Sequence, residues 1–558
     1  MSLFEGVSAI VDTNNSTRAT NRADCSRKRG SRAPGSHASR DRVPGFDPLV
    51  PTRFRWPAHN DPVMSTQAAT EERTVVIGLE VHVQLETDTK IFCGCSTEPA
   101  DDEAPNTRTC PTCLGLPGAL PVLNEGAVEA AVKIGKAIDA GIPETTTFHR
   151  KNYYYPDLPK NFQLTQYDAP ICQAGELEVR VDDEPRTIGI TRAHLEEDPG
   201  SLQHAGGSIE SATHTLVNYN RAGTPLMEIV TEPDFRSPAE TRAFLAKLEE
   251  VLEYLGVFDP TRDGSLRVDA NVSLVPDDHV GENGEITEDA LAAANRAEVK
   301  NISSHKGAEQ ALAYEVTRQR NVLRRGREIE QETRHWDEAR GVTVSMRSKE
   351  AEKDYRYFRE ADLPALEVSD WKAQIPIPEL PDARRERFRE EYGLDRESAS
   401  KLTSTKEVAD FFEDVAESFD PDLAATWVAD NLLGELNYRE MEITDVEGRL
   451  DEFTRLIELV DAEELTVKNA EEIVLREMLD EGDDPETIIE REGLGKAESG
   501  EVESAVAAAI DENPDAVADY HDGDEGAINF LVGQVMQATG GSADPGQVNG
   551  LLREELDG

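Results

Sequence analysis

The segment VVIGLEVHVQL, residues 75–85, limits the possible folds more than any other part of the chain. Its residues alternate between an apolar set and a mixed set, and the apolar set is Ile77, Leu79, Val81, Val83 and Leu85. A period of two is typical of a β-strand whose two faces meet different surroundings. The sequence therefore predicts a sheet with one face on a hydrophobic core, with Glu80 and His82 together on the opposite face.

Further strands and helices are expected in the same part of the chain. Apolar and β-branched runs predict strands at 186–193, 213–218, 227–231, 266–274, 297–302 and 342–346. Apolar residues at helical spacing predict helices at 125–140, 237–255 and 306–324. The acidic stretch 276–289 is expected to be a surface loop. Short strands joined by long connections favour an α+β domain with a large, mostly antiparallel sheet.

A proline-rich stretch at 375–381 separates this domain from a helical remainder. Apolar periodicity predicts helices at 406–417, 421–436, 448–459, 467–480, 500–511 and 525–538. We therefore predict a sheet domain at 64–375, an all-α helical domain at 376–485 and a small helical tail domain at 486–558.

The charge of the chain indicates the medium in which it folds. It has 111 acidic and 58 basic side chains, which gives a formal net charge of -53. Such self-repulsion opposes compaction at low ionic strength, but near molar salt the Debye length shrinks to about 3 Å. The balance is typical of a cytosolic protein of a halophile, because periodic apolar runs argue against a disordered acidic chain. The sequence has no apolar run of the length that a membrane span requires.

The first 63 residues differ from the rest in composition. They carry ten basic and six acidic side chains, are rich in serine, proline, glycine and arginine, and lack the apolar segment of a signal peptide. We expect them to be disordered or not translated, with Met64 as the start of the protein. A basic arm that binds nucleic acid is the alternative.

Four of the six cysteines form two closely spaced pairs: Cys93 and Cys95, then Cys110 and Cys113. In a cytosolic protein, two such pairs favour a Zn²⁺ site over disulfide bonds. Four thiolates complete a tetrahedral shell and leave no position for water, so such an ion would be structural. Four reduced, buried thiols are the alternative.

Acidic residues recur on the expected strands and turns of the sheet. Besides Glu80 and His82, the candidates are Glu196, Glu197, Asp269, Asn271, Glu298 and Lys300. Carboxylates from several strands could converge on Mg²⁺, which prefers a few carboxylates together with water and phosphate oxygens. Left buried and unpaired, these charges would cost several kcal/mol each. A solvated polar face without a ligand is the alternative.

The segment 150–167 combines aromatic and basic residues within an otherwise acidic chain, including Tyr153, Tyr154, Tyr155 and Lys160. Aromatic rings can stack on unpaired bases, and cations can meet phosphates. A tyrosine-rich core strand and turn is the alternative. The sequence has neither a GxxxxGK[ST] phosphate loop nor a GxSxG motif. Any phosphoryl transfer would therefore depend on metal ions and sheet residues.

Several strings in this sequence resemble the GatB subunit of the GatCAB aspartyl/glutamyl-tRNA amidotransferases: VIGLEVHVQL, RKNYYYPDLPKNFQLTQYD, HLEEDPG, NYNRAGTPLMEIVTEPD and KDYRYFREADLP. The resemblance runs from about Val75 to Leu552. It implies a protein that phosphorylates the side-chain carboxylate of a misacylated tRNA with ATP. It also implies two partners in a GatCAB heterotrimer: a glutaminase subunit, whose ammonia then displaces the phosphate, and a small subunit that clamps the pair.

The resemblance also implies roles for individual residues and domains. The magnesium site would comprise Glu80, His82, Glu196 and Glu197, with Asp269, Asn271, Glu298 and Lys300 near the nucleotide. Tyr153, Tyr154, Tyr155 and Lys160 would meet the 3′ end of the tRNA. The four cysteines would hold structural zinc. The sheet domain would be a catalytic cradle, and the tail domain would contact the tRNA elbow.

The absence of a large insertion between Leu363 and Asp382 favours the GatB type over the related GatE type. A zinc-stapled, RNA-binding adaptor without kinase activity is the alternative function.

Overall fold

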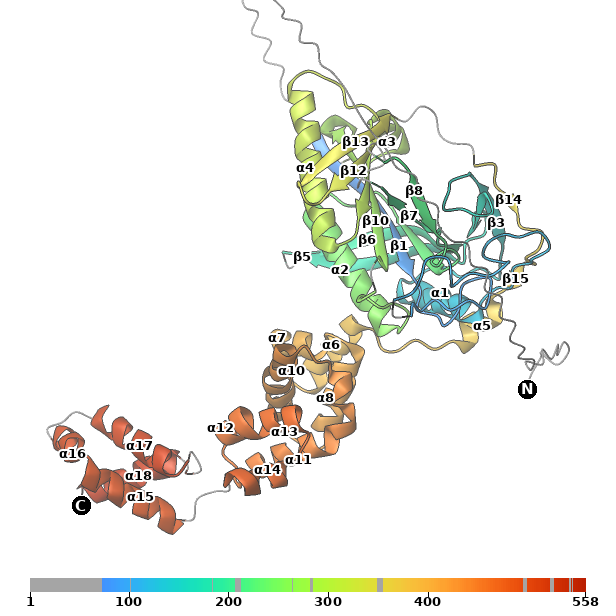
Figure 1. Ribbon diagram of the computed structural model, residues 1–558. Coiled ribbons are helices and arrows are strands. Elements are labelled where there is room, and N and C mark those ends of the chain that lie inside the picture. Colours follow the sequence, from blue (N-terminus) through green and yellow to red (C-terminus); the bar gives the residue numbers. More distant parts are fainter. Residues whose placement is uncertain are drawn as a thin grey trace, which may run out of the picture. The chain divides into compact units, whose positions relative to one another are not determined.

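The structure, a computed structural model, describes residues 73–557 except 101, 183, 206–211, 263, 282–284, 349–354, 495–498, 522–525, 541–542 and 544. The expected extension 1–63 and the expected start at Met64 lie outside the described residues. Figure 1 shows a sheet-rich first part and a helical second part. The predicted α+β fold class is confirmed. No helix in the described part of the chain combines the length and hydrophobicity needed to cross a membrane.

A mixed sheet of eleven strands organises the first part of the chain. In spatial order the strands are β13 (Val342–Ser348), β12 (Glu332–Asp337), β11 (Ala297–Ile302), β10 (Leu266–Pro276), β1 (Arg73–Gln84), β9 (Pro225–Thr231), β6 (Glu184–Glu197), β4 (Phe162–Gln166), β3 (Phe148–Asn152) and β14 (Phe358–Arg359), with β5 (Cys172–Val181) paired to β6. The pairing of β11 with β12 is parallel, whereas the other strand pairs in the described part of this sheet are antiparallel. The sheet is therefore mostly antiparallel, as predicted.

Strand β1 lies inside the sheet and has the two faces that its sequence predicts. Ile77, Leu79 and Val81 are at most 1% exposed and belong to the main hydrophobic core. Glu80 lies opposite Asp269 of β10, and His82 lies opposite Glu228 of β9. Since directly paired residues project from the same face, these side chains share the polar face of the sheet.

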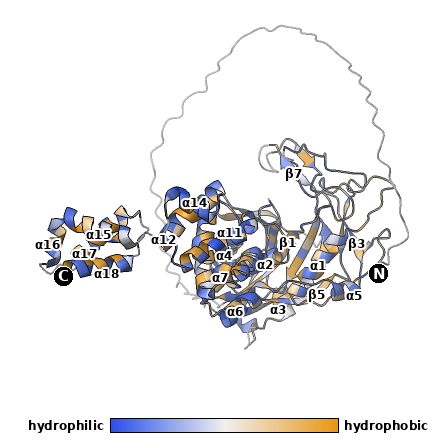
Figure 2. Cartoon of the chain, turned by 90° about the horizontal axis from the view of Figure 1, so that it is seen from below, coloured by the Kyte–Doolittle hydropathy of each residue, from blue (hydrophilic) through white to orange (hydrophobic). Residues whose placement is uncertain are grey.

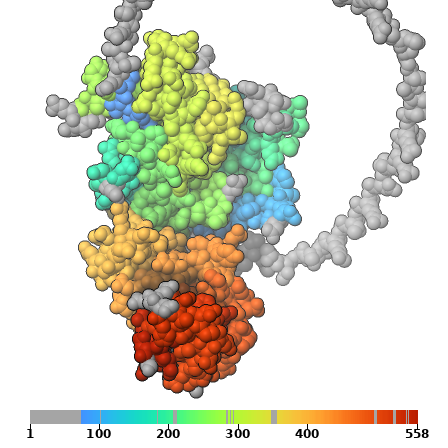
Figure 3. Space-filling model, turned by 90° about the vertical axis from the view of Figure 1, so that its left-hand side faces the viewer, coloured from blue at the N-terminus to red at the C-terminus, as the bar shows by residue number. Residues whose placement is uncertain are grey.

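Three helices supply the other half of this core: α1 (Glu125–Ala137), α2 (Pro238–Tyr254) and α4 (His305–Arg324). Ser237 caps α2 by accepting a hydrogen bond from the backbone N–H of Glu240, and Pro238 occupies its first turn. In the space-filling view of Figure 3, α4, β12 and the edge strand β13 form a continuous yellow-green to yellow surface.

The remaining elements of the first part are short. They are β2 (Thr145–Thr146), β7 (Ser201–His204), β8 (Thr215–Asn218), α3 (Glu288–Ala293), β15 (Leu366–Glu367) and α5 (Ser369–Gln374). The strand expected at 213–218 is therefore present as β8, but it pairs with β7 outside the large sheet. The expected acidic loop contains a 3₁₀ turn at Asp277–His279 and the start of α3.

In its described residues, the second part of the chain contains helices and turns and no strand. A second core forms among α6 (Pro381–Glu391), α7 (Arg396–Leu402), α8 (Lys406–Ala416), α9 (Pro421–Ala425), α10 (Leu433–Arg439), α11 (Leu450–Asp461), α12 (Val467–Asn469), α13 (Leu475–Glu481) and α14 (Pro485–Glu492). Two π-helical segments, Thr426–Leu432 and Ala470–Val474, join α9 to α10 and α12 to α13.

A third core lies among the tail helices α15 (Ser499–Glu512), α16 (Pro514–His521), α17 (Gly526–Ala538) and α18 (Pro545–Asp557). Val502, Leu531 and Leu552 are at most 1% exposed there. Figure 2 shows that these helices carry both hydrophilic and hydrophobic residues, as expected of amphipathic helices. The boundaries predicted between the domains remain predictions.

Candidate active site and metal centre

The polar face of the sheet carries a compact group of carboxylates and imidazoles at its centre. Nε2 of His82 on β1 lies 3.3 Å from Oε1 of Glu196 on β6 and 3.7 Å from Oε2 of Glu228 on β9. Nε2 of His194, also on β6, lies 3.2 Å from the same oxygen of Glu228. Strand pairing explains the grouping, because Glu228 lies opposite His82 on one side and His194 on the other.

Three of these residues, His82, Glu196 and Glu228, can each offer one ligand atom within 4.8 Å of the others. Oε2 of Glu196 is buried and has no hydrogen-bond partner among the described residues. Burial by itself would lower the pKa of His82, but its hydrogen bond to Glu196 and the charge of Glu228 raise that pKa to about 9. The position therefore favours positive charge, and its donor set of two carboxylates and one imidazole fits Mg²⁺ or Mn²⁺.

A second acidic group lies beside the first on the same face. Nδ2 of Asn271 donates a hydrogen bond to Oε1 of Glu80 at 3.3 Å. The ammonium of Lys300 pairs with Asp269 and lies 3.1 Å from Oε1 of Glu298. Burial and the nearby charge of Glu228 raise the pKa of Glu80. The structure thus brings together the five residues Glu80, Asp269, Asn271, Glu298 and Lys300 that the sequence analysis had selected.

Glu197 lies on the other side of the sheet from Glu196, because neighbouring residues of a strand point to opposite faces. Its Oε2 lies 2.5 Å from Nζ of Lys160, and its Oε1 accepts a hydrogen bond from the backbone N–H of Leu164 at 2.8 Å. Both side chains line a cavity of about 200 Å³ that Cys93 and Cys113 also line. The structure therefore does not bring Glu197 or Lys160 to the group around His82.

The three successive tyrosines, Tyr153, Tyr154 and Tyr155, lie in different surroundings. Tyr154 and Tyr155 are 86% and 47% exposed. Tyr153 instead lies 5.7 Å, centroid to centroid, from Tyr355, and this ring set continues to Tyr357 and Tyr167. The last two rings are stacked at 4.1 Å. We call Tyr153, Tyr167, Tyr355 and Tyr357 the tyrosine wall.

Lys151 connects the tyrosine wall to the acidic face. Its Nζ lies 5.4 Å from the ring centroid of Tyr355. Burial opposes its charge, but Glu196 and Glu228 raise the pKa of Lys151 above its ordinary value. Among the described residues, no carboxylate lies within ion-pair distance of its ammonium.

The sequence analysis did not select Glu228, His194 or Lys151 as site residues. A signal for Glu228 existed, since it is the single charged residue in the otherwise uncharged strand PLMEIVT. A charge in such a buried strand requires a partner. His194 stands two residues before Glu196, on the same face of β6. Lys151 gave no comparable signal, because it follows another basic residue, Arg150, in a segment that the sequence analysis read as a whole.

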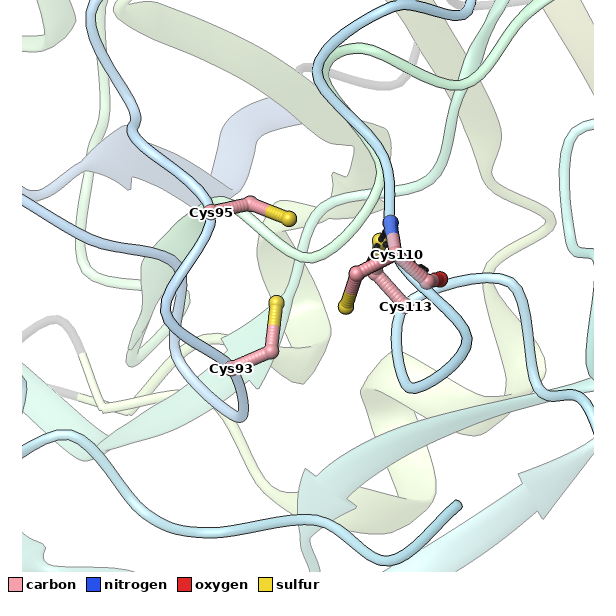
Figure 4. A group of neighbouring side chains, drawn as sticks. All are labelled: Cys93, Cys95, Cys110 and Cys113. Carbon is pink, nitrogen blue, oxygen red and sulfur yellow. Dashed lines mark hydrogen bonds between the residues drawn. The ribbon is translucent and has the colours of Figure 1, made fainter. Parts of the chain in front are cut away.

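Figure 4 shows the four cysteines facing one another, with Cys93 and Cys95 on one loop and Cys110 and Cys113 on another. Their Sγ atoms lie within 4.8 Å of one another, and all four are free. The backbone N–H of Cys110 donates a hydrogen bond to Sγ of Cys113 at 3.1 Å. Interaction with Cys93 and the charge of Lys90 lower the pKa of Cys113 to about 5, although burial opposes this. Zn–S bonds of about 2.3 Å in a tetrahedron require sulfurs at about this spacing, so the four residues fit zinc.

The fold is a sheet-rich part that carries two groups of residues able to hold a metal ion, followed by a helical part. The sequence matches the GatB/GatE catalytic domain over residues 75–374 and the GatB domain over residues 410–556. The chain therefore belongs to the GatB/GatE family, and the resemblance stated from the sequence is confirmed.

Curated relatives match the chain over nearly their whole length. A protein of Natronomonas pharaonis, named as the B subunit of an aspartyl/glutamyl-tRNA(Asn/Gln) amidotransferase, is 77% identical over 89% of this chain and 100% of its own length. A protein of the same name from Haloquadratum walsbyi is 74% identical over 88% of this chain and 99% of its own length. A third protein of this name, from Methanosarcina mazei, is 53% identical over 86% of this chain and 98% of its own length.

Proposed function

We propose that this chain is the kinase and amide-forming subunit of a tRNA-dependent amidotransferase. It phosphorylates the side-chain carboxylate of misacylated Asp-tRNA(Asn), Glu-tRNA(Gln) or both, with ATP, and ammonia then displaces the phosphate. Family membership and the names of the relatives support this role rather than that of an RNA-binding adaptor. The observation that carries it is the group His82, Glu196 and Glu228, with one buried carboxylate oxygen that lacks a partner among the described residues.

The proposed reaction joins two anions, so the site has to offset charge. In the first step the carboxylate oxygen attacks the γ-phosphorus, the bond to ADP breaks, and an acyl phosphate forms. In the second step ammonia attacks the acyl carbon and inorganic phosphate leaves. Bound Mg²⁺ would neutralise and align the phosphate oxygens in the first step.

The residues of the polar face have different proposed roles in this reaction. His82, Glu196 and Glu228 would hold the cation. Glu80, Asp269 and Glu298 form the neighbouring acidic group, in which Lys300 already offsets part of the charge. Asn271 orients Glu80 through their hydrogen bond. Lys151 offers a positive charge close to Glu196 and Glu228, and such a charge can stabilise a transferred phosphoryl group.

The tyrosine wall is the proposed place for an unpaired base at the 3′ end of the tRNA. Stacking on an aromatic ring contributes about 1–3 kcal/mol per base and persists at high salt. That matters for a chain with a net charge of -53, since molar salt weakens both its repulsion from RNA and any cation-driven attraction. Tyr154 and Tyr155 are exposed and could contact the same strand of RNA. The tail domain is the proposed contact for the body of the tRNA.

We also propose a structural Zn²⁺ ion at Cys93, Cys95, Cys110 and Cys113. The proposed partners are the glutaminase subunit, which supplies ammonia, and the small subunit of a GatCAB heterotrimer. The shared name of the relatives, which designates one subunit of an amidotransferase, supports a complex of this kind. Such a complex would act in the cytoplasm, where tRNA is aminoacylated.

The test is a transamidation assay with the co-expressed partner subunits in molar KCl, using both misacylated tRNAs, ATP and glutamine. The wild-type complex is expected to release ADP and to form amidated tRNA. Glu228→Gln is expected to lower the rate of ADP release at least 100-fold while leaving glutamine hydrolysis and assembly intact. The matched control is Glu176→Gln, which changes an exposed carboxylate on β5. A wild-type complex that binds these tRNAs without releasing ADP would instead support the adaptor.

A further inference from the structure

Lys90 is a fully buried lysine beside the four cysteines, with a relative exposure of 0%. Its Nζ donates a hydrogen bond to the backbone carbonyl of Arg108 at 2.9 Å and lies 3.4 Å from that of Tyr219. Within the described residues, no carboxylate lies at ion-pair distance from this ammonium. Lysine is almost never fully buried unless an anion pairs with it, so the position of Lys90 requires an explanation.

The groups that offset the burial of Lys90 are cysteine thiols, which have to lose their protons when they bind a metal. Burial lowers the pKa of Lys90, and the charges that oppose this effect come from Cys113, Cys93 and Cys95. Lys90, Cys93 and Cys113 also line one cavity. The neighbouring cation Arg108 differs, because its Nε lies 2.9 Å from Oε1 of Glu103. Lys90 thus depends on the cysteines for a counter-charge, whereas Arg108 has a carboxylate.

Formal charges show why a four-thiolate centre needs such a cation. Four thiolates and one divalent ion leave two negative charges in a partly buried site, where the low dielectric makes uncompensated charge costly. An ammonium held nearby by neutral carbonyl groups offsets one of these charges. Each charge then makes the burial of the other less costly.

Backbone contacts hold Lys90 between the two cysteine pairs. Its own N–H donates a hydrogen bond to the carbonyl of Cys95 at 2.9 Å, and its ammonium binds the carbonyl two residues before Cys110. Gly223, with φ +87°, covers the side chain. A Cβ added to this glycine would lie 3.6 Å from Cδ of Lys90 and 3.6 Å from Cβ of Cys113. The positive φ favours glycine there, which keeps the backbone close.

We propose that Lys90 is the charge partner of the four-cysteine metal centre. Its ammonium offsets the negative charge of the metal-bound thiolates and raises the affinity of the centre for Zn²⁺, and the loaded centre in turn makes the burial of Lys90 favourable. This inference rests on the proposed zinc site.

The test compares zinc binding by the full chain and its variants in molar KCl, with a chromophoric chelator as competitor. Lys90→Met removes the charge at similar length, and Lys90→Gln removes the charge but keeps a hydrogen-bond donor. Both are expected to raise the apparent Kd for Zn²⁺ at least tenfold. The control is Lys133→Met, which changes a lysine on α1 that pairs with Glu129. Full affinity in Lys90→Gln together with a loss in Lys90→Met would overturn the charge role in favour of hydrogen bonding.

Thermal unfolding supplies a second measurement, because a charge partner of the metal and a merely structural lysine predict different changes in Tm when zinc is removed. With zinc bound, Lys90→Met is expected to lower Tm. After the zinc is stripped, the same change is expected to raise Tm, because it removes a buried charge without a partner. The same fall in Tm in both states would refute the inference. A wild-type chain that binds no zinc would refute the zinc site itself, whereas equal zinc affinity in wild type and variants would refute only the role of Lys90.

Discussion

Replacing Lys160 with methionine tests the electrostatics on the cavity side of the sheet. The ammonium of Lys160 lies 2.5 Å from Oε2 of Glu197, and the two side chains are 12% and 6% exposed. The second oxygen of Glu197 keeps its hydrogen bond from the backbone N–H of Leu164. Methionine preserves most of the length and apolar surface of lysine. The variant therefore leaves Glu197 as a buried carboxylate with one remaining donor.

The expected loss of stability follows from that arrangement. Removing one partner of a buried ion pair costs about 3–5 kcal/mol, because the remaining charge is uncompensated. The Leu164 N–H remains, and a hydrogen bond to a charged group contributes about 1.5–3 kcal/mol. We therefore expect a loss of about 3 kcal/mol in the free energy of unfolding, near the lower end of that range. Molar salt changes this little, since screening acts mainly on exposed charges.

Urea unfolding in molar KCl, followed by circular dichroism, measures the effect. Adding Glu197→Gln to Lys160→Met removes the unpaired charge, and the double variant is expected to recover about 2 kcal/mol. The control is Lys133→Met, whose pair with Glu129 is 25% and 46% exposed and is expected to contribute less than about 1 kcal/mol. If Lys160→Met behaves like this control, Glu197 is not a buried charge held by Lys160, and the reasoning fails.

Three further perturbations have defined outcomes. Burial and the charges of Glu249 and Glu250 raise the pKa of Glu253 from 4.5 to about 7. Its effect on stability is therefore absent below pH 4.5, becomes increasingly unfavourable between pH 4.5 and 7, and is constant above pH 7. Glu253→Gln is therefore expected to stabilise the chain by about 1 kcal/mol above pH 7, after discounting for partial exposure and salt, and not at all below pH 4.5, in urea titrations across pH. Gly115→Ala is expected to lower both Tm and the rate of transamidation. Gly115 has φ +65°, and an added Cβ would lie 2.3 Å from Cγ of Lys160. An unchanged Tm would contradict this close contact between Gly115 and Lys160. Lys151→Met is expected to slow ADP release at least tenfold, with Lys151→Arg partly active, in single-turnover assays at saturating tRNA; equal rates would exclude a role for its charge.

The sequence predicted those parts of the site that depend on local periodicity or spacing. The alternation in β1 placed Glu80 and His82 on one face, and two closely spaced cysteine pairs indicated a single centre. Local patterns could not predict which strands pair when they lie far apart in the sequence. Glu228 joins His82 only through the register of β9 against β1, a partnership over 146 positions of sequence that no local pattern encodes.

Local patterns also explain where the sequence analysis grouped residues that the structure separates. Glu196 and Glu197 are adjacent in sequence, yet a strand directs adjacent side chains to opposite faces. The same period of two could have separated them if the strand expected at 186–193 had been extended to its observed end at Glu197. Strands β3 and β4 were not expected, because FHRKN and FQLTQ are short and mostly polar, and offer too few apolar residues for the pattern on which the prediction relied.

The end of β6 has a further consequence. The backbone N–H of Gly223 donates a hydrogen bond to the carbonyl of Asp198, and the carbonyl of Gly223 accepts one from the N–H of Ile91. Gly223 therefore links the segment that leads into Cys93 to the residue that follows Glu197. Glu196 and Glu197 then connect the acidic face to the cysteine cavity through a single peptide bond. A protein engineer who wishes to redesign the chemistry on either side of this sheet would have to leave that dipeptide in place, because twisting it for one side misaligns the other.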